Sequence, residues 1–291
     1  MDNTSHAVVA NTARGPIQYC ERKENHSDIQ GAILTIHGAM GGYEQSDILG
    51  QAIGPKGYRY IAVSRPGYLQ TPLKGKESPE EQADLLAALM DELGIQQAVV
   101  MAISGGGYSA LHFSLRHPER CRALILCSTT GSKNDVPVPF AFTVMKVMAR
   151  VPLLVNLMRN RFLKNVEKSV KRSVSYPDIA QNLINDEQLM TYYTDLTIST
   201  MSHMGKRIPG TVNDIHITQN TEYPLEEIIV PTLVIHGSDD PVVPFAKHGK
   251  KLAERIPGAQ LCLAERGEHM AIFTHNQQVR NAVSGFLDSL P

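Results

Sequence analysis

Residues 99–108 read Val99-Val100-Met101-Ala102-Ile103-Ser104-Gly105-Gly106-Gly107-Tyr108, an apolar run that leads through a serine and three glycines into a helical pattern. The apolar run predicts a buried strand. A sharp strand–serine–helix turn crowds the backbone, which small residues relieve, and it leaves the serine Oγ exposed at the carboxyl edge of a sheet. The N–H of Gly105 then lies at a helix N-terminus, where it favours a developing oxyanion.

A glycine-rich phosphate loop, or a plain strand–helix turn, is the alternative interpretation of this stretch. The contiguous glycines do not fit GxGxxG, and the sequence has no GKS or GKT segment for a P-loop. The stretch therefore favours a nucleophilic serine at position 104.

Short β-branched runs on both sides alternate with helical patterns, which predicts an α/β fold with a mostly parallel sheet flanked by helices. The expected strands are residues 7–10, 17–20, 32–36, 60–63, 98–103, 123–127, 232–235 and 260–263. The clearest helix opens at Ser78 with a capping box completed by Glu81, and Gly94 ends it.

The strand–helix alternation is interrupted over residues 132–227. This segment contains helical patterns rich in Met, Leu and Val, at 140–158 and 186–204. Because a structureless loop of this length is unusual in a compact domain, we expect a helical insertion between the sixth and seventh strands. The predicted core is then residues 1–131 and 228–291. The methionines of the insertion are expected to pack its core or to line an apolar pocket.

Two segments that follow later strands carry the other groups a nucleophilic serine needs. Asp239 and Asp240 follow the strand that ends at His236-Gly237, and His269 follows the last strand. A serine needs a base to take its proton, and a neutral imidazole is suited to that at pH 7. A buried carboxylate fixes the imidazole tautomer. Taken singly, His269 suits a surface loop and the two aspartates suit a turn or a helix cap.

Taken together, these segments resemble the α/β-hydrolase superfamily over essentially the whole chain outside the variable insertion. Ala102-Ile103-Ser104-Gly105-Gly106 is similar to the G-x-S-x-G turn, with Ala102 in place of the first glycine. The order Ser104, Asp240, His269 matches the nucleophile–acid–histidine order of the superfamily. Ser64 replaces an acid that is structural in the family. The insertion at 132–227 falls where the superfamily has its cap, which covers the active site and sets substrate choice.

The resemblance also implies an oxyanion hole at the turn His37-Gly38-Ala39-Met40-Gly41-Gly42. Its donors are the backbone N–H groups of Ala39 and Gly105, and Met40 is the next candidate after Ala39. His37 and His236 both end strands in His-Gly turns, and we expect them to serve backbone hydrogen bonding rather than metal ligation.

Asp240 is preferred to Asp239 as the catalytic carboxylate. In the resembled motif the acid stands three positions after the glycine that ends the strand, and a proline follows four positions later; counting from Gly237 reaches Asp240 and then Pro244. Neighbours in an extended turn point in different directions, so only one can accept the Nδ1–H of His269. We expect Asp239 to face solvent or to cap a helix that starts near Pro244.

The resulting hypothesis is a serine hydrolase that cleaves a small or medium carboxylic ester through an acyl-enzyme, with no cofactor and no metal. Hydrolysis of a C–C bond, a lactone, an amide or a thioester by the same triad is an alternative, because one fold hosts many chemistries. An alternative of another class is a non-catalytic binding protein on the same fold, which predicts loss of a triad member.

Charge and composition limit the partners. The 28 Lys and Arg residues against 29 Asp and Glu give a net charge of −1, which provides no global field for nucleic acid. No run of 18 apolar residues suggests an integral membrane segment. Four dispersed cysteines and the lack of a signal-like N-terminus favour reduced thiols and a cytoplasmic protein with a small-molecule substrate.

One part of the insertion, residues 146–172, is basic and amphipathic. It has eight basic residues and one acid, Glu167: Lys146, Arg150, Arg159, Arg161, Lys164, Lys168, Lys171 and Arg172. We expect a solvated face that is balanced by Asp178, Asp186 and Glu187. Contact with anionic lipid, or attraction of an anionic substrate, is the alternative.

Overall fold

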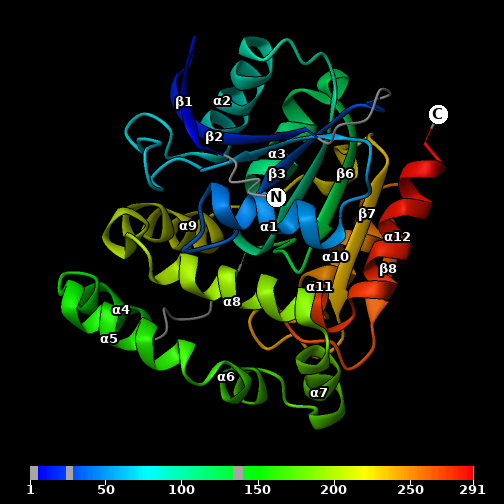
Figure 1. Cartoon of the computed structure of the whole chain (residues 1–291). Coiled ribbons are helices and arrows are strands. Elements are labelled where there is room, and N and C mark those ends of the chain that lie inside the picture. Colours follow the sequence, from blue (N-terminus) through cyan, green and yellow to red (C-terminus); the bar gives the residue numbers. More distant parts are fainter. Residues whose placement is uncertain (1–5, 24–28, 134–139, 291) are drawn as a thin grey trace.

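The computed structural model describes residues 6–23, 29–133 and 140–290. In these residues an eight-stranded sheet has the order β1-β2-β4-β3-β5-β6-β7-β8 (Figure 1). Strand β2 (Gly15–Lys23) runs antiparallel to both β1 (Val8–Thr12) and β4 (Arg59–Val63). All later neighbours are parallel, namely β3 (Ala32–Ile36), β5 (Ala98–Ile103), β6 (Cys121–Cys127), β7 (Thr232–Gly237) and β8 (Gln260–Ala264). The predicted mostly parallel sheet is confirmed.

The predicted strand bounds are correct for β3 and β5. The strand expected over 7–10 is shifted to Val8–Thr12, and the other predicted strands are too short. β2 is the largest difference: it covers nine residues, and its polar end from Glu21 to Lys23 pairs with β4. Backbone pairing with β4 keeps these polar residues in the strand, which the apolar pattern alone does not reveal. β7 continues to Gly237, where it pairs with Ala264 of β8.

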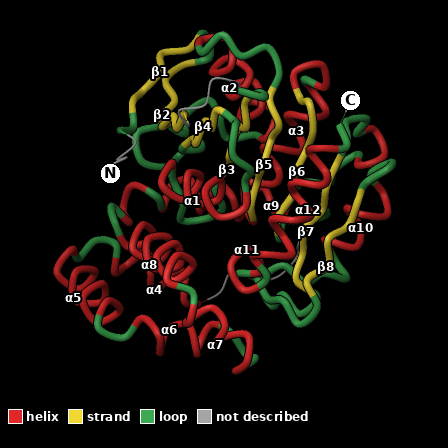
Figure 2. The backbone as a smooth tube through the Cα atoms, turned by 45° about the vertical axis from the view of Figure 1, so that its right-hand side comes forward, coloured by secondary structure: helices red, strands yellow, loops and turns green. Residues whose placement is uncertain are grey.

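Helices cover both faces of the sheet (Figure 2). Side chains alternate along each strand: Val100 and Ala102 of β5 belong to one apolar cluster, and Val99 and Met101 to the other. The first cluster includes residues of α2 (Pro79–Glu92), α3 (Gly107–Arg116) and α10 (Gly249–Arg255), and the second includes residues of α1 (Tyr43–Ile53), α11 (Ala271–Thr274) and α12 (Asn276–Asp288). The predicted capping box of α2 is present, with reciprocal bonds between Ser78 and Glu81.

Between β6 and β7 the described residues form α4 (Phe140–Met148), α5 (Pro152–Leu163), α6 (Val166–Ser173), α7 (Pro177–Asn185), α8 (Glu187–Met201) and α9 (Ile208–Asn220). These helices lie within the predicted insertion at 132–227; residues 134–139 of that range are outside the described residues. Helix α8 packs against α1 of the core and against α5 (Figure 1).

Two helix predictions in this segment are wrong in their bounds. The helical pattern over 140–158 forms two helices, α4 and α5, because Pro152 lacks an N–H and its ring disfavours a helical Val151. The helix expected over 186–204 ends at Met201, since His203 adopts a left-handed conformation with φ of 51°. In the described ranges, no helix is long and apolar enough to cross a membrane.

Candidate active site

Three side chains from three loops meet at the carboxyl edge of the sheet. Ser104 follows β5, Asp240 follows β7 and His269 follows β8. His269 Nε2 lies 3.1 Å from Ser104 Oγ, and His269 Nδ1 lies 2.8 Å from Asp240 Oδ2. Because the carboxylate accepts from Nδ1–H, Nε2 is left to accept the serine proton. The three residues that the sequence singled out therefore form one hydrogen-bonded chain.

The turn that carries Ser104 is tightly constrained. Ser104 has a left-handed backbone with φ of 50°, a conformation that only close surroundings maintain in a non-glycine residue. A Cβ on Gly106 would lie 2.6 Å from the carbonyl oxygen of His37, so glycine is required there. The Thr129 hydroxyl donates to the Ser104 carbonyl at 2.5 Å. Ala102, which departs from the G-x-S-x-G pattern, is fully buried in β5.

The two neighbouring aspartates have different surroundings. Asp240 is 3% exposed, and its second carboxylate oxygen accepts the N–H groups of Val242 and Val243 at 2.8 and 2.9 Å. Burial alone would raise the pKa of Asp240, but the bonds from His269 and these N–H groups hold it below its usual range.

Asp239 is exposed and has no contact with His269 among its described bonds; it accepts the hydroxyls of Tyr176 and Ser238. Asp239 is exposed, as expected, but its contact with Tyr176 was not anticipated from the sequence. The helix expected near Pro244 begins only at Gly249.

The turn after β3 lies against the serine turn. A Cβ on Gly38 would come 2.9 Å from Ser104 Cβ, and one on Gly105 would come 3.3 Å from the Ala39 nitrogen. The backbone of Ala39 therefore lies close to that of Gly105, beside Ser104. The N–H of Met40 donates to Thr211 Oγ1 at 3.1 Å, so this alternative donor is already occupied.

Histidines 37 and 236 hydrogen-bond to the backbone, as expected from their turns. His37 Nε2 accepts the Arg65 N–H at 2.9 Å, and its Nδ1–H donates to the Gly38 carbonyl at 2.6 Å. Burial, with the nearby Arg65 charge, holds the pKa of His37 well below its usual range, so the ring is neutral. His236 Nε2–H donates to the Val243 carbonyl at 2.7 Å.

The largest feature that sequence reasoning missed is a buried ion pair between Arg65 and Asp214. Arg65 is 1% exposed, and its two terminal nitrogens lie 2.9 and 2.6 Å from the Asp214 oxygens. Its Nε donates to the His37 carbonyl at 2.9 Å and its Nη2 to the Gly38 carbonyl at 3.2 Å. One guanidinium therefore joins α9 of the insertion to the turn beside Ser104.

Two tyrosines complete this ion pair. Tyr68 donates to Asp214 at 2.5 Å, and Arg65 Nη1 donates to the Tyr108 hydroxyl at 2.6 Å. Burial alone would lower the pKa of Arg65, but Asp214 holds it well above its usual range. A charged residue two positions after an apolar strand was a signal for Arg65 in the sequence; Asp214, in a mixed helix, gave none.

A second set of contacts joins the insertion to the turns that carry Asp240 and His269. Tyr176 donates to Asp239, and Ser175 donates through its N–H and hydroxyl to Glu268 at 2.8 and 2.6 Å. Asp178 and Arg266 form a two-point ion pair at 2.8 and 3.0 Å. The start of α7 is thereby attached to both turns.

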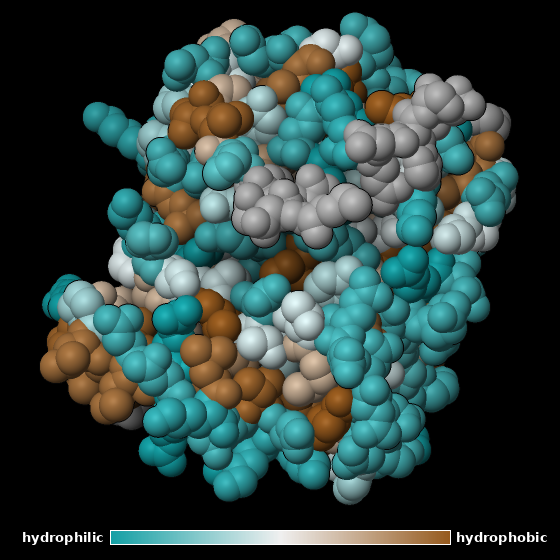
Figure 3. Space-filling model, viewed as in Figure 1, coloured by the Kyte–Doolittle hydropathy of each residue, from teal (hydrophilic) through white to brown (hydrophobic). Residues whose placement is uncertain are grey.

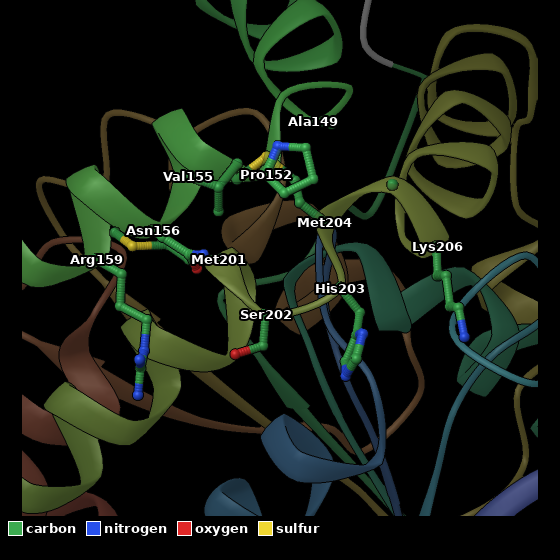
Figure 4. Close-up of a pocket in the computed structure, with 11 residues that line it drawn as sticks. Ala149, Pro152, Val155, Asn156, Arg159, Met201, Ser202, His203, Met204 and Lys206 are labelled. Atoms are coloured by element: carbon green, nitrogen blue, oxygen red, sulfur yellow. The ribbon is translucent and has the colours of Figure 1, made fainter.

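A pocket of about 450 Å³ lies within the insertion, between α5 and the turn after α8 (Figure 4). Val155 and Arg159 line it from α5, and Met201 and Met204 line it from the other side (Figure 4). Met204 and Val155 form one apolar cluster with Met40 of the turn after β3. In the described ranges, no group of three or more His, Cys, Asp or Glu residues is arranged to hold a metal ion.

This combination of fold and site defines an α/β hydrolase. A sequence model of the alpha/beta hydrolase fold family matches residues 31–276, and the chain belongs to this family.

Among the similar proteins is the 2-hydroxy-6-oxononadienedioate/2-hydroxy-6-oxononatrienedioate hydrolase of Comamonas testosteroni, 29% identical over 261 residues, with 88% of this chain and 87% of that protein covered. The 2-hydroxy-6-oxo-6-phenylhexa-2,4-dienoate hydrolase of Burkholderia cepacia is 28% identical over 268 residues, with 88% and 87% covered. An alpha/beta hydrolase fold protein from Nakamurella multipartita superposes with a TM-score of 0.82 at 26% identity, covering 97% of this chain and 99% of that one.

The buried ion pair leads to a stability prediction. Asp214→Asn keeps the shape of the side chain but leaves Arg65 charged and unpaired in the interior, which is expected to cost about 3–5 kcal/mol of unfolding free energy. Asp178→Asn, which breaks the exposed pair with Arg266, is the matched control and is expected to cost less than about 1 kcal/mol. Urea unfolding of both variants measures the difference, and equal losses would contradict the role assigned to burial.

Proposed function

We propose that Ser104 is the nucleophile of a hydrolase, His269 its general base and acid, and Asp240 the carboxylate that orients the imidazole. The observation that carries this proposal is the continuous chain of hydrogen bonds from Ser104 Oγ through His269 to the buried Asp240. The Ala39 and Gly105 N–H groups are proposed as the oxyanion donors, which is supported by their proximity to each other and to Ser104.

The proposed reaction begins when Ser104 Oγ adds to a carbonyl carbon and its proton passes to His269 Nε2. The oxyanion that forms is stabilised by the two backbone N–H groups. The bond to the leaving group then breaks, and the leaving atom keeps the electron pair and takes the proton from His269. Water, deprotonated by His269, releases the acyl group as a carboxylic acid and restores the serine.

The names of the relatives support the C–C alternative better than the ester hypothesis. They describe 2-hydroxy-6-oxo acids, which have a ketone on a conjugated carbon chain and no ester linkage. Hydrolysis of such a molecule with addition of water at the ketone breaks the adjacent C–C bond, and the conjugated chain stabilises the carbon that keeps the electron pair. We therefore propose a C–C bond hydrolase of keto acids of this class.

The helical segment 132–227 is proposed as the cap that sets substrate choice. Support comes from its two attachments to the catalytic edge, through Asp214 at Arg65 and through residues 175–178 at the turns of Asp240 and His269. Both attachments place helices of this segment next to the site.

Ser104→Ala tests the nucleophile. The variant removes one hydroxyl and is expected to fold normally by circular dichroism, with kcat reduced by at least about 10³-fold. Covalent labelling by a fluorophosphonate probe is expected for the wild type and not for the variant. A wild type that is neither labelled nor active on any carbonyl substrate would support the non-catalytic alternative instead.

The two aspartates provide an internal comparison. Asp240→Asn is expected to reduce kcat by up to about 10⁴-fold, because the amide favours the wrong imidazole tautomer. Asp239→Asn retains an oxygen that accepts from Tyr176 and is expected to keep kcat close to the wild-type value. Steady-state kinetics of both variants on one substrate give the ranking, and the reverse order would show that Asp239 is the catalytic carboxylate.

A substrate comparison distinguishes the two bond types. We expect kcat/KM for 2-hydroxy-6-oxo-6-phenylhexa-2,4-dienoate to exceed that for p-nitrophenyl esters with acyl chains of two to eight carbons by at least about a hundredfold. A site that hydrogen-bonds the polar groups of a keto acid discriminates against a substrate that lacks them. Loss of the conjugated chromophore and release of p-nitrophenol are the readouts. A higher kcat/KM for an ester would return the assignment to a carboxylesterase.

A further inference from the structure

Helices α4 and α5 expose a group of apolar side chains, which we call the α4–α5 surface: Val144, Val147, Val151, Leu153, Leu154 and Leu157. Leu153 is 78% exposed, Leu157 is 65% and Val147 is 60%. In Figure 3 these helices carry the brown area at the lower left, with teal residues around it. Single exposed apolar residues are ordinary, but a cluster on two neighbouring helices marks an interaction surface.

The exposure follows from the way α5 is attached. Its buried residues are Val155 and Phe162, seven positions apart and therefore on one side of the helix. Leu153 and Leu157 lie on the opposite side, and Lys164, just beyond the helix end, continues the same line. The N-terminal part of this outward side carries Leu153 and Leu157, and its C-terminal part carries the basic residues Arg161 and Lys164.

The basic residues of 146–172 are not balanced. All eight are exposed, and within the described part of the chain none of them forms an ion pair. Exposed arginines elsewhere do: Arg116 pairs with Asp84 and Arg266 pairs with Asp178. The positive charge of this segment is therefore a local field with one acid, Glu167, within it.

Two of the three acids expected to balance this face, Asp178 and Asp186, have partners elsewhere. Asp178 is bound to Arg266 at the core, and Asp186 accepts the Leu189 N–H as the N-cap of α8. A solvated face also does not explain why leucines and valines lie in the open among the basic residues. Both observations favour the alternative of a contact surface.

We propose that the α4–α5 surface docks on an anionic lipid bilayer. Exposed leucines and valines enter the boundary between headgroups and acyl chains, while the surrounding lysines and arginines meet the negative headgroups. A second copy of the chain is a poorer occupant, because its own basic residues would face these across the interface. This inference goes beyond the proposed hydrolase activity and does not depend on the substrate.

The test is co-sedimentation of the full chain with two kinds of sucrose-loaded vesicle. One is phosphatidylcholine alone, and the other contains about 30% of the anionic lipid phosphatidylglycerol. We expect binding to the anionic vesicles and little to the neutral ones, and we expect it to weaken as salt rises from about 0.05 to 0.5 M. Equal binding to both compositions, or binding to neither, would overturn the proposal.

Variants locate the contact. Arg161→Glu/Lys164→Glu is expected to weaken binding to anionic vesicles at least about tenfold, since each basic residue near the surface contributes about 1 kcal/mol. Leu153→Ser/Leu157→Ser is expected to weaken it through lost apolar insertion. The controls are Lys74→Glu and Ile229→Ser, because Lys74 and Ile229 lie outside the α4–α5 surface. Ile229 is 78% exposed, the same exposed fraction as Leu153.

All four variants must retain hydrolysis of a water-soluble substrate, which shows that they fold. If the controls weaken vesicle binding as much as the surface variants do, the binding depends on the overall composition of the protein and not on this surface, and the proposal is overturned. Light scattering after gel filtration tests whether a second copy of the chain occupies the surface instead. If the wild type is a dimer that does not bind vesicles, and Leu153→Ser/Leu157→Ser makes it a monomer, the surface is a dimer interface and the proposal is overturned.

Discussion

The buried pair of Arg65 and Asp214 is the interaction on which the arrangement of the site depends. A guanidinium that is 1% exposed is tolerated because Asp214 meets it at two points and its other N–H groups donate to the carbonyls of His37 and Gly38 and to the Tyr108 hydroxyl. The same bonds define the path of the turn that presents Ala39 to Ser104. The charge pair therefore positions an element of the site while it attaches α9 to the core.

The sheet supplies the other constraint. Parallel strands bring the turns after β5, β7 and β8 to one edge, where Ser104, Asp240 and His269 are within hydrogen-bond distance. The left-handed Ser104 is maintained by close packing of Gly106 against the β3 turn and of Thr129 against the serine carbonyl. The rigidity of this turn comes from its neighbours, which explains why the flanking residues must be small.

The helical segment between β6 and β7 has two sides with different chemistry. Its inner side is attached to the catalytic edge by charges and hydroxyls, at Asp214 and at residues 175–178. Its outer side, on α4 and α5, combines exposed leucines and valines with basic residues that form no ion pair within the described ranges. Two of the three acids expected to balance the outer side have other partners: Asp178 pairs with Arg266 on the inner side, and Asp186 caps α8. A lipid contact and a substrate-selecting cap are therefore compatible in one segment.

The sequence by itself determined the features that depend on short spacings: the central strands, the capping box of α2 and the turn at Ser104. Such features follow from backbone sterics and hydrogen bonds between near neighbours. The break at Pro152 was also local, and its signal was present in the sequence. The choice of Asp240 over Asp239 came from the motif of the resembled superfamily.

Only the tertiary structure decided the length of β2, which two partner strands extend, and the pairing of Arg65 with Asp214, which lie 149 positions apart. It also decided that Asp178 neutralises Arg266 instead of the basic stretch. Partners of charged groups are chosen by proximity in the folded chain, and no periodicity in the sequence encodes that proximity.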